Sequence, residues 1–313
     1  VRGKIAAGDL VAYMLYVSTL IATIRRIIEF AEQFQRGMTG IERFLQIVDA
    51  DIEIFDEPDA VELNDPKGEI SFEKVSFEYP DDHNKVFTDL NLQIHAGEKV
   101  AIVGPSGGGK TTLCNLIPRF YDVTRGRVLV DGIDVRDMEP EKLRSKIGMV
   151  LQKAVLFRGT IRENLFWGNE GATDEEIWEA LKTAQAEEFI RAKEGGLDAN
   201  IEQGGRNLSG GQRQRLTIAR ALVKKPRLLI LDDSASALDY ATDAALRKAI
   251  RQMEGAPTVF IVSQRTSSLM SADRILVLDD GEATGYGTHE ELLKNCQTYR
   301  EIYNSQYGKK EEA

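Results

Sequence analysis

The most uniform apolar run in the chain lies near the N-terminus, where residues 10–24 contain no charged side chain. Arg25 and Arg26 follow directly, and basic residues commonly flank the cytoplasmic end of a membrane helix. Apolar side chains then continue at helical spacing as far as Phe34. Because a bilayer core requires about 20 predominantly apolar residues, the run is short for a lone span. The pattern predicts a helix that either crosses a membrane or packs its apolar face on a partner.

A change in polarity separates this helix from the rest of the chain. Residues 49–59 are rich in acidic side chains, and residues 64–68 are turn-forming. We therefore predict four segments. Residues 1–36 contain the apolar helix, and residues 37–66 form a linker that is helical and then extended. Residues 67–308 form a globular domain, and residues 309–313 form a frayed tail.

Within the globular domain, strand patterns alternate with helical ones. Residues 70–79 alternate apolar and polar side chains, as a half-buried strand does. Residues 99–103 and 227–231 are almost entirely apolar, as buried parallel strands are. The pattern predicts an α/β domain with a small antiparallel sheet from residues 69–100 and a mostly helical region near residues 155–218.

The composition excludes several classes of protein. The chain has 313 residues, 42% of them hydrophobic and 29% charged, which is the balance of a folded and not a disordered chain. The formal net charge of -10 argues against broad binding to nucleic acid. The two cysteines, Cys114 and Cys296, are far apart, which excludes a disulfide scaffold.

A glycine-rich motif follows the strand predicted at residues 99–103. Residues 104–111 fit the phosphate-binding P-loop pattern, in which glycines let successive N–H groups point at phosphate oxygens. A helix beginning at Lys110 adds the positive end of its dipole, while Lys110 neutralises phosphates and the Thr111 hydroxyl binds Mg²⁺. The alternative is a structural glycine-rich turn. The predicted nucleotide-binding residues are Gly104, Pro105, Ser106, Gly107, Gly108, Gly109, Lys110, Thr111 and Thr112.

An acidic residue ends the second buried strand. Four apolar residues run into Asp232, where a P-loop protein needs a carboxylate for Mg²⁺. The alternative is that Asp232 and Asp233 only cap the next helix.

A second predicted anion-binding motif lies further along the chain. Leu208, Ser209, Gly210, Gly211 and Gln212 precede an arginine-rich helix, and glycines before a helix N-terminus favour anions. Because the chain has two anion-binding motifs but only one of them is a P-loop, we expect each nucleotide to be shared between two subunits.

At this point the sequence resembles the ATP-binding cassette (ABC) family, with residues 208–212 as its signature motif. The resemblance implies that Tyr79 stacks on adenine and that Gln152 senses Mg²⁺ together with the γ-phosphate. It also implies an interface loop that crosses to the second cassette, formed by Ser236, Ala237, Leu238 and Asp239. The implied Mg²⁺ set is Thr111, Gln152 and Asp232.

The resemblance also implies a fold class and a set of cofactors. It implies an α/β P-loop NTPase of the ABC type, with a RecA-like core, an antiparallel β subdomain and an α-helical signature subdomain, preceded by a transmembrane helix. ATP and Mg²⁺ are the implied cofactors.

Further segments narrow the resemblance to ABC exporters. Residues 156–165 look like the exporter segment that receives the membrane domain's coupling helices, and residues 202–205 sit where exporters have a cross-talk loop. Residues 8–11 and 42–44 resemble the last membrane helix and the elbow below it. The resemblance implies a fragment of a membrane domain fused to a cytoplasmic cassette, in the plasma or inner membrane. The implied partners are a second exporter half and the lipid bilayer, and no binding of nucleic acid is implied. The cargo stays open among drugs, lipids and peptides.

Two positions depart from the family pattern. The family has a glutamate as general base where this chain has Asp233, and a switch-loop histidine where it has Gln264. The shorter Asp233 carboxylate falls back by about 1 Å, and a misplacement of that size can cost about 10²-fold in rate. Glutamine cannot become a cation as histidine can. The predicted catalytic residues are therefore the altered Asp233 and Gln264, together with Gln152.

These departures lead to a hypothesis about the assembly. In a heterodimeric exporter, this subunit's P-loop would form a degenerate site, and its signature motif would complete the competent site of the partner. The main alternative is a homodimeric exporter that hydrolyses ATP slowly with Asp233 as base. A soluble ABC protein acting on DNA or ribosomes, and a regulatory module without turnover, are two further alternatives.

Overall fold

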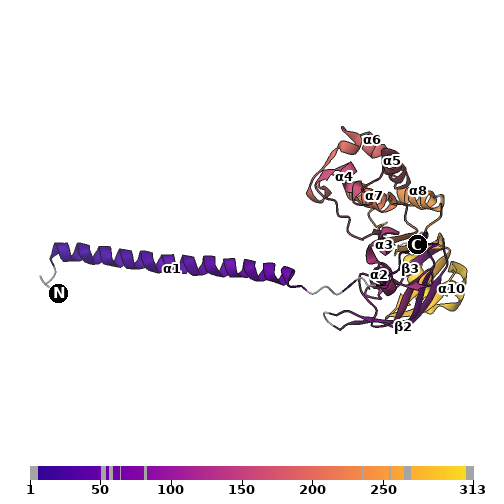
Figure 1. The fold of residues 1–313 in the computed structure, drawn as a ribbon, viewed down its shortest axis with the longest axis horizontal. Coiled ribbons are helices and arrows are strands. Elements are labelled where there is room, and N and C mark those ends of the chain that lie inside the picture. Colours follow the sequence, from indigo (N-terminus) through magenta and orange to yellow (C-terminus); the bar gives the residue numbers. More distant parts are fainter. Residues whose placement is uncertain are drawn as a thin grey trace. The chain divides into compact units, whose positions relative to one another are not determined.

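The computed structural model describes residues 6–50, 54–55, 59–63, 65–80, 83–234, 236–253, 255–263 and 269–307. The chain divides into two compact units, Val1–Phe55 and Asp56–Ala313 (Figure 1). The first unit contains one long helix, α1 (Ala7–Val48), in which no residue is buried. This helix of 42 residues runs without a break past Arg36, so the helical part of the predicted linker continues the apolar helix.

The second unit is built on a central sheet of six strands. Their order is β12 (Glu282–Gly287), β11 (Arg274–Asp279), β3 (Lys99–Val103), β10 (Thr258–Val262), β9 (Leu228–Asp232) and β6 (Ile147–Val150). All neighbours pair in parallel except β12, which is antiparallel to β11. Every residue of β9 and β10 is buried, as the nearly continuous apolar sequence of these strands requires.

A second, antiparallel sheet has the order β2 (Lys85–Ile94), β1 (Ile70–Glu78), β4 (Arg125–Val130) and β5 (Ile133–Asp134). The sequence prediction drew this sheet only from residues 69–100, and it was incomplete. β4 and β5 follow the P-loop helix in the chain yet pair with β1, while β3 belongs to the central sheet. The antiparallel sheet and one face of the central sheet share a core, which includes Phe72, Val128 and Leu228.

The predicted helical region forms a lobe whose buried side chains pack together with one face of the central sheet. It contains α4 (Ile161–Phe166), α5 (Asp174–Thr183), α6 (Glu187–Arg191) and α7 (Gly210–Leu222), with the short pair β7 (Gly159–Thr160) and β8 (Asn200–Ile201). Figure 1 shows α4 to α7 gathered with α8 (Tyr240–Arg251) at one end of this unit. The other helices with described bounds are α2 (Lys110–Leu116), α3 (Pro140–Ser145), α10 (His289–Asn295), α11 (Gln297–Tyr307) and the short turns η1 (Val135–Asp137), η2 (Gly196–Asp198) and η3 (Gln203–Gly205).

The end of the predicted linker packs on the second unit. Leu63 is buried in the core of the two sheets. The Asp131 carboxylate accepts hydrogen bonds from the backbone N–H groups of Lys67, Gly68 and Glu69 at 2.7–3.3 Å. The chain is therefore fixed to the sheet just before β1 begins.

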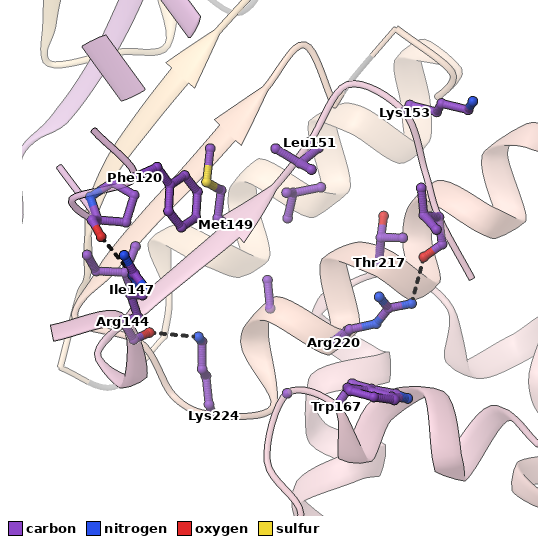
Figure 2. A pocket seen from close by; sticks show the side chains of 15 residues that line it. Phe120, Arg144, Ile147, Met149, Leu151, Lys153, Trp167, Thr217, Arg220 and Lys224 are labelled. Carbon is purple, nitrogen blue, oxygen red and sulfur yellow. Dashed lines mark hydrogen bonds between the residues drawn. The ribbon is translucent and has the colours of Figure 1, made fainter. Parts of the chain in front are cut away.

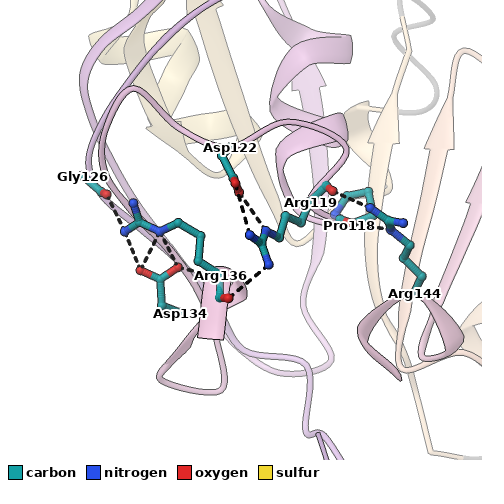
Figure 3. Close-up of polar contacts among 7 residues, drawn as sticks. All are labelled: Pro118, Arg119, Asp122, Gly126, Asp134, Arg136 and Arg144. Carbon is teal, nitrogen blue, oxygen red and sulfur yellow. Dashed lines mark hydrogen bonds and ion pairs between the residues drawn. The ribbon is translucent and has the colours of Figure 1, made fainter. Parts of the chain in front are cut away.

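Arginine side chains fasten the segment that follows α2. The buried Arg119 donates two hydrogen bonds to the Asp122 carboxylate and one to the main-chain oxygen of Arg136 (Figure 3). Arg136 pairs with Asp134, and Arg144 on α3 donates to the carbonyl oxygens of Pro118 and Arg119 at 3.0 and 2.6 Å. The end of the P-loop helix is thus tied to both α3 and the antiparallel sheet.

Candidate functional site

The P-loop lies between a buried strand and a short helix. β3 delivers the chain to Gly104, and α2 begins at Lys110, as the sequence predicted. Gly109 caps α2 with φ 86°, and a Cβ atom there would lie 2.7 Å from the Phe87 ring. Both the left-handed backbone and the close approach of Phe87 therefore require glycine at this position.

The Lys110 side chain curls back over the loop. Its Nζ atom donates hydrogen bonds to the carbonyl oxygens of Gly104 and Pro105 at 2.9 and 2.5 Å. Burial lowers the pKa of the Lys110 ammonium, against the attraction of Asp232 and Asp233. A cation held among main-chain atoms at a helix N-terminus is placed to bind phosphate oxygens.

Two of the three predicted Mg²⁺ ligands, which come from distant parts of the chain, meet beside Lys110. The Thr111 hydroxyl donates to Oδ2 of Asp232 at 3.0 Å, although the residues are 121 positions apart. Burial raises the pKa of the Asp232 carboxyl, and the hydrogen bond from Thr111 opposes that rise. A hydroxyl and a carboxylate are oxygen ligands of the kind that Mg²⁺ takes alongside phosphate oxygens.

Asp233 and Gln152 also come together. Gln152 follows β6, and its Nε2 atom donates to Oδ2 of Asp233 at 3.2 Å. The Asp233 backbone has φ 45°, a left-handed conformation that aspartate tolerates better than most residues. Its carbonyl oxygen accepts hydrogen bonds from the N–H and hydroxyl of Ser236. The carboxylate is thereby held toward the glutamine and beside the Asp232 strand end.

Tyr79 lies against the P-loop helix through a contact that the sequence did not indicate. Its hydroxyl is 2.9 Å from the hydroxyl of Thr112. Its ring packs edge-on against Phe77 and Tyr121, with centroids 5.0 and 5.3 Å away. Sequence reasoning missed Phe77 and Tyr121, and only the alternating pattern of β1 pointed to Phe77 as buried.

The signature motif lies on the helical lobe, apart from the P-loop. Ser209 caps α7, since its hydroxyl accepts from the Gln212 N–H and its own N–H donates to Oε1 of Gln212 at 3.0 Å. Leu208 is buried together with Leu229, whereas Leu113 of the P-loop helix is buried together with Leu228. Because side chains alternate along β9, the helical lobe and the P-loop helix pack on opposite faces of the central sheet. The chain therefore does not bring its own signature motif together with its own P-loop.

The predicted interface loop begins beside Asp233 and ends at a helix cap. Asp239 caps α8 by accepting from the N–H and hydroxyl of Thr242 at 2.9 and 2.8 Å. These bonds lower the pKa of the Asp239 carboxyl. Ala237 packs beside the signature motif, because a Cβ at Gly211 would lie 3.1 Å from its carbonyl oxygen. Leu238 is buried. Gln264 lies outside the residues that the structure describes.

Comparison with known proteins agrees with this geometry. Residues 87–236 match the sequence model of the family described as ABC transporter. The Bacillus subtilis ABC transporter ATP-binding protein YwjA is 41% identical over 308 residues, which cover 98% of this chain and 53% of the relative. The ATP-dependent lipid A-core flippase of Desulfotalea psychrophila is 41% identical over 306 residues, with the same two coverages. The chain contains an ABC transporter nucleotide-binding domain.

A solved structure supports the same assignment for nearly the whole chain. A bacterial Atm1-family ABC exporter with ATP bound matches with a TM-score of 0.80 and 35% identity, over 98% of this chain and 54% of that one. The predicted fold class, a P-loop NTPase of the ABC type behind a long apolar helix, is confirmed. The domain is an ABC transporter ATPase domain, and ATP use follows from the family. The chain spans about half the length of the relatives it matches.

Two further observations concern the place of this ABC transporter chain in the cell. α1 is long and apolar enough to cross a membrane, with a mean hydropathy of 1.5 in its most apolar window. In this family the ATP-binding domain lies on the cytoplasmic side of the membrane.

The described residues contain no cluster of three or more His, Cys, Asp or Glu side chains that would hold a metal by themselves.

A groove between the two lobes of the ABC domain was not predicted. It has a volume of about 270 Å³ and lies where β6, α3 and the end of α7 meet (Figure 2). Its wall includes apolar side chains such as Leu151 and Trp167, which are 52% and 70% exposed. The lining residues lie within the segments 118–120, 144–155, 167–168 and 217–224. No local sequence pattern marks such a meeting point.

Proposed function

We propose that this chain is the ATP-binding part of a membrane ABC exporter subunit that couples ATP binding and hydrolysis, at an interface between two cassettes, to export. The observation that carries the proposal is the separation of Lys110 and Ser209, which begin or cap helices packed on opposite faces of the central sheet. A complete nucleotide site then requires the signature motif of a second cassette, arranged head to tail with this one. The long apolar α1 supports a membrane location.

Different site residues would bind the adenine, the phosphates and the Mg²⁺ ion. Tyr79 would stack on the adenine, and the P-loop N–H groups with Lys110 would hold the phosphates. Thr111, Asp232 and Gln152 would hold Mg²⁺, which when bound neutralises the charge that develops on the phosphates. Because Thr111 and Asp232 are hydrogen-bonded at 3.0 Å, their oxygens already lie within reach of one cation.

We infer that this subunit's own site hydrolyses ATP slowly. Asp233 is one methylene shorter than the glutamate that serves as base in the family, and its carboxylate is engaged by Gln152 at 3.2 Å. Gln264 replaces a histidine that could carry a charge. ATP bound here would hold the two cassettes together, while the intact signature residues 208–212 would complete a faster site on a different, partner exporter half.

The groove of Figure 2 provides the coupling to the membrane. We propose that it receives a cytoplasmic segment of the membrane domain, because it lies at the junction of the two lobes and is rimmed by exposed apolar side chains. Rotation of the helical lobe on ATP binding would then move that segment and rearrange the membrane helices.

The decisive experiment is an ATPase assay on the full-length subunit in detergent, purified alone and then together with the exporter half encoded beside it. Activity that requires the partner supports the heterodimer. Robust activity of the subunit alone, abolished by Asp233→Asn, would instead establish a homodimer in which Asp233 is the working base. Absence of ATP-dependent activity in both preparations would contradict the exporter proposal itself.

A further inference from the structure

Three aromatic rings from two distant segments of the chain meet beside the P-loop helix. Phe77 lies in β1, Tyr79 directly follows that strand, and Tyr121 lies beyond α2. The Tyr79 ring centroid is 5.0 Å from that of Phe77 and 5.3 Å from that of Tyr121, and the last two centroids are 5.7 Å apart. Phe77 is buried, whereas Tyr79 and Tyr121 are half-buried. Each ring of this cluster therefore contacts the other two.

The hydroxyl contact of Tyr79 does not fix the plane of its ring. The phenol oxygen lies on the axis about which the ring turns, so its 2.9 Å contact with the buried Thr112 hydroxyl survives rotation about that axis. The neighbouring rings restrain the plane instead, since they lie at 79° to it for Phe77 and 87° for Tyr121. Aromatic pairs favour such edge-to-face arrangements. The plane that a stacked base must match thus depends on Phe77 and Tyr121.

Tyr121 contributes its ring to this cluster and not its hydroxyl. Within the residues that the structure describes, the Tyr121 hydroxyl makes no hydrogen bond. Phe77 is part of the core that the antiparallel sheet shares with the central sheet, whereas Tyr121 packs against the outside of that core. Tyr121 can therefore be replaced with less disturbance to the fold than Phe77.

The segment that carries Tyr121 is anchored on both sides. The buried Arg119 donates to the Asp122 carboxylate at 2.8 and 3.2 Å, so this ion pair spans the two residues between them (Figure 3). Further along, the Thr124 hydroxyl accepts a hydrogen bond from the N–H of Glu78 at 3.2 Å. The Tyr121 ring is thereby tied to the end of the strand that leads to the stacking tyrosine.

We propose that Tyr121 is a positioning residue for base recognition, because it holds the Tyr79 ring in the plane against which the adenine stacks. This inference rests on the proposed function, which assigns the stacking to Tyr79. Without the Tyr121 ring, the Tyr79 ring can turn about its axis, and a turned ring overlaps the base over a smaller area. Tyr121 therefore acts on the share of ATP affinity that the base contributes, and not on the share that the phosphates contribute through Lys110 and the P-loop.

The test compares two ligands of the full-length subunit in detergent by isothermal titration calorimetry. MgATP carries the base, whereas magnesium tripolyphosphate carries three phosphates without base or sugar. Tyr121→Leu should weaken MgATP binding by about fivefold, because base–aromatic stacking contributes at least this factor to affinity. It should leave tripolyphosphate binding unchanged. The matched control is Tyr121→Phe, which keeps the ring and should bind both ligands as the unmodified subunit does.

A double-mutant cycle separates positioning from direct contact with the base. In the Tyr79→Ala background, Tyr121→Leu should cause no further loss of MgATP affinity, because the ring that Tyr121 positions is gone. A further loss of about fivefold in that background would show that Tyr121 does not act through Tyr79, and the inference would be wrong. Equal weakening of both ligands by Tyr121→Leu would also overturn it, since a general disturbance of the fold has that effect.

Thermal unfolding without nucleotide shows whether each variant is folded. If Tyr121→Leu does not fold, Tyr121→Met replaces it, with the same expected results and the same contradicting ones. Unchanged MgATP affinity in a folded Tyr121→Leu variant would remove the inference while the proposed function stands. Failure of the unmodified subunit to bind MgATP would instead overturn the proposed function.

Discussion

Gln152 and Asp233 are hydrogen-bonded at 3.2 Å across the gap between the glutamine loop and the end of β9. Gln152 is the second residue after β6, and Asp233 is the first residue after β9, so two parallel neighbours bring these side chains to one sheet edge. The carboxylate that would orient water is therefore in direct contact with the residue that connects the two lobes.

Asp233→Glu should increase ATP hydrolysis at this subunit's own site. The longer side chain moves the carboxylate forward by about 1 Å, and the expected gain is about tenfold. The left-handed backbone at φ 45° suits glutamate less well than aspartate, so a loss of about 1 kcal/mol in unfolding free energy should accompany the gain. The measurement is the ATPase rate in an assembly whose partner has lost its own base.

Asp233→Asn is the control for this gain, because it keeps the size of the side chain and removes its charge. Unchanged or lower activity of Asp233→Glu would show that side-chain length does not limit this site.

Ser209→Ala should lower turnover of the heterodimer more than Asp233→Asn does. Ser209 caps the signature helix and would face the nucleotide on the partner's P-loop, whereas Asp233 belongs to the slow site. Loss of an N-cap also costs about 1 kcal/mol of stability, so folding must be checked separately by thermal unfolding. Ser209→Asn, which retains capping ability, separates the two effects. The opposite ranking of the two ATPase rates would contradict the degenerate-site proposal.

Local patterns in the sequence were sufficient to predict the strand and the helix that flank the P-loop. The strand at Lys99–Val103 and the helix beginning at Lys110 both follow from residues that are adjacent in the chain. The apolar run into Asp232 likewise predicted a buried strand, and every residue of β9 is buried.

Features that depend on distant residues could not be predicted in the same way. β4 joins β1 through pairs such as Phe72 and Val128, which no local periodicity identifies. The Tyr79–Thr112 contact depends on the packing of α2 against the antiparallel sheet. The groove depends on contacts between distant residues, such as the hydrogen bond from Lys224 beyond α7 to the main-chain oxygen of Arg144. Resemblance to the family indicated which residues matter but did not indicate these contacts.

Tyr79→Ala should weaken ATP binding by about tenfold, because stacking of a base on an aromatic ring is worth about 1–3 kcal/mol. Tyr79→Phe keeps the ring and loses only the hydroxyl contact with Thr112, so its ATP affinity should stay close to that of the unmodified protein. The lost hydrogen bond should cost about 1 kcal/mol of unfolding free energy. Fluorescent ATP titration measures affinity, and equal weakening by both variants would exclude stacking as the role of the ring.

Asp232→Asn should stabilise the chain while weakening Mg²⁺-dependent ATP binding. Burial raises the pKa of Asp232 above the ordinary 3.8, so the folded state binds its proton more tightly than the unfolded state does. The contribution of this group to stability is therefore fully present below pH 3.8 and is lost as the pH rises through the raised folded-state pKa. The advantage of Asp232→Asn should grow across that window and then stay constant.

Denaturant unfolding of the two proteins without nucleotide, over a pH series, measures this difference. Thr111→Val serves as the second variant, because it removes the hydrogen bond that holds the pKa of Asp232 down, and the window should then move to higher pH. A difference in unfolding free energy that does not change with pH would show that Asp232 is not the titrating group. Mg²⁺ titration of ATP binding completes the test, since a stabilised variant with unchanged Mg²⁺ dependence would remove Asp232 from the proposed metal site.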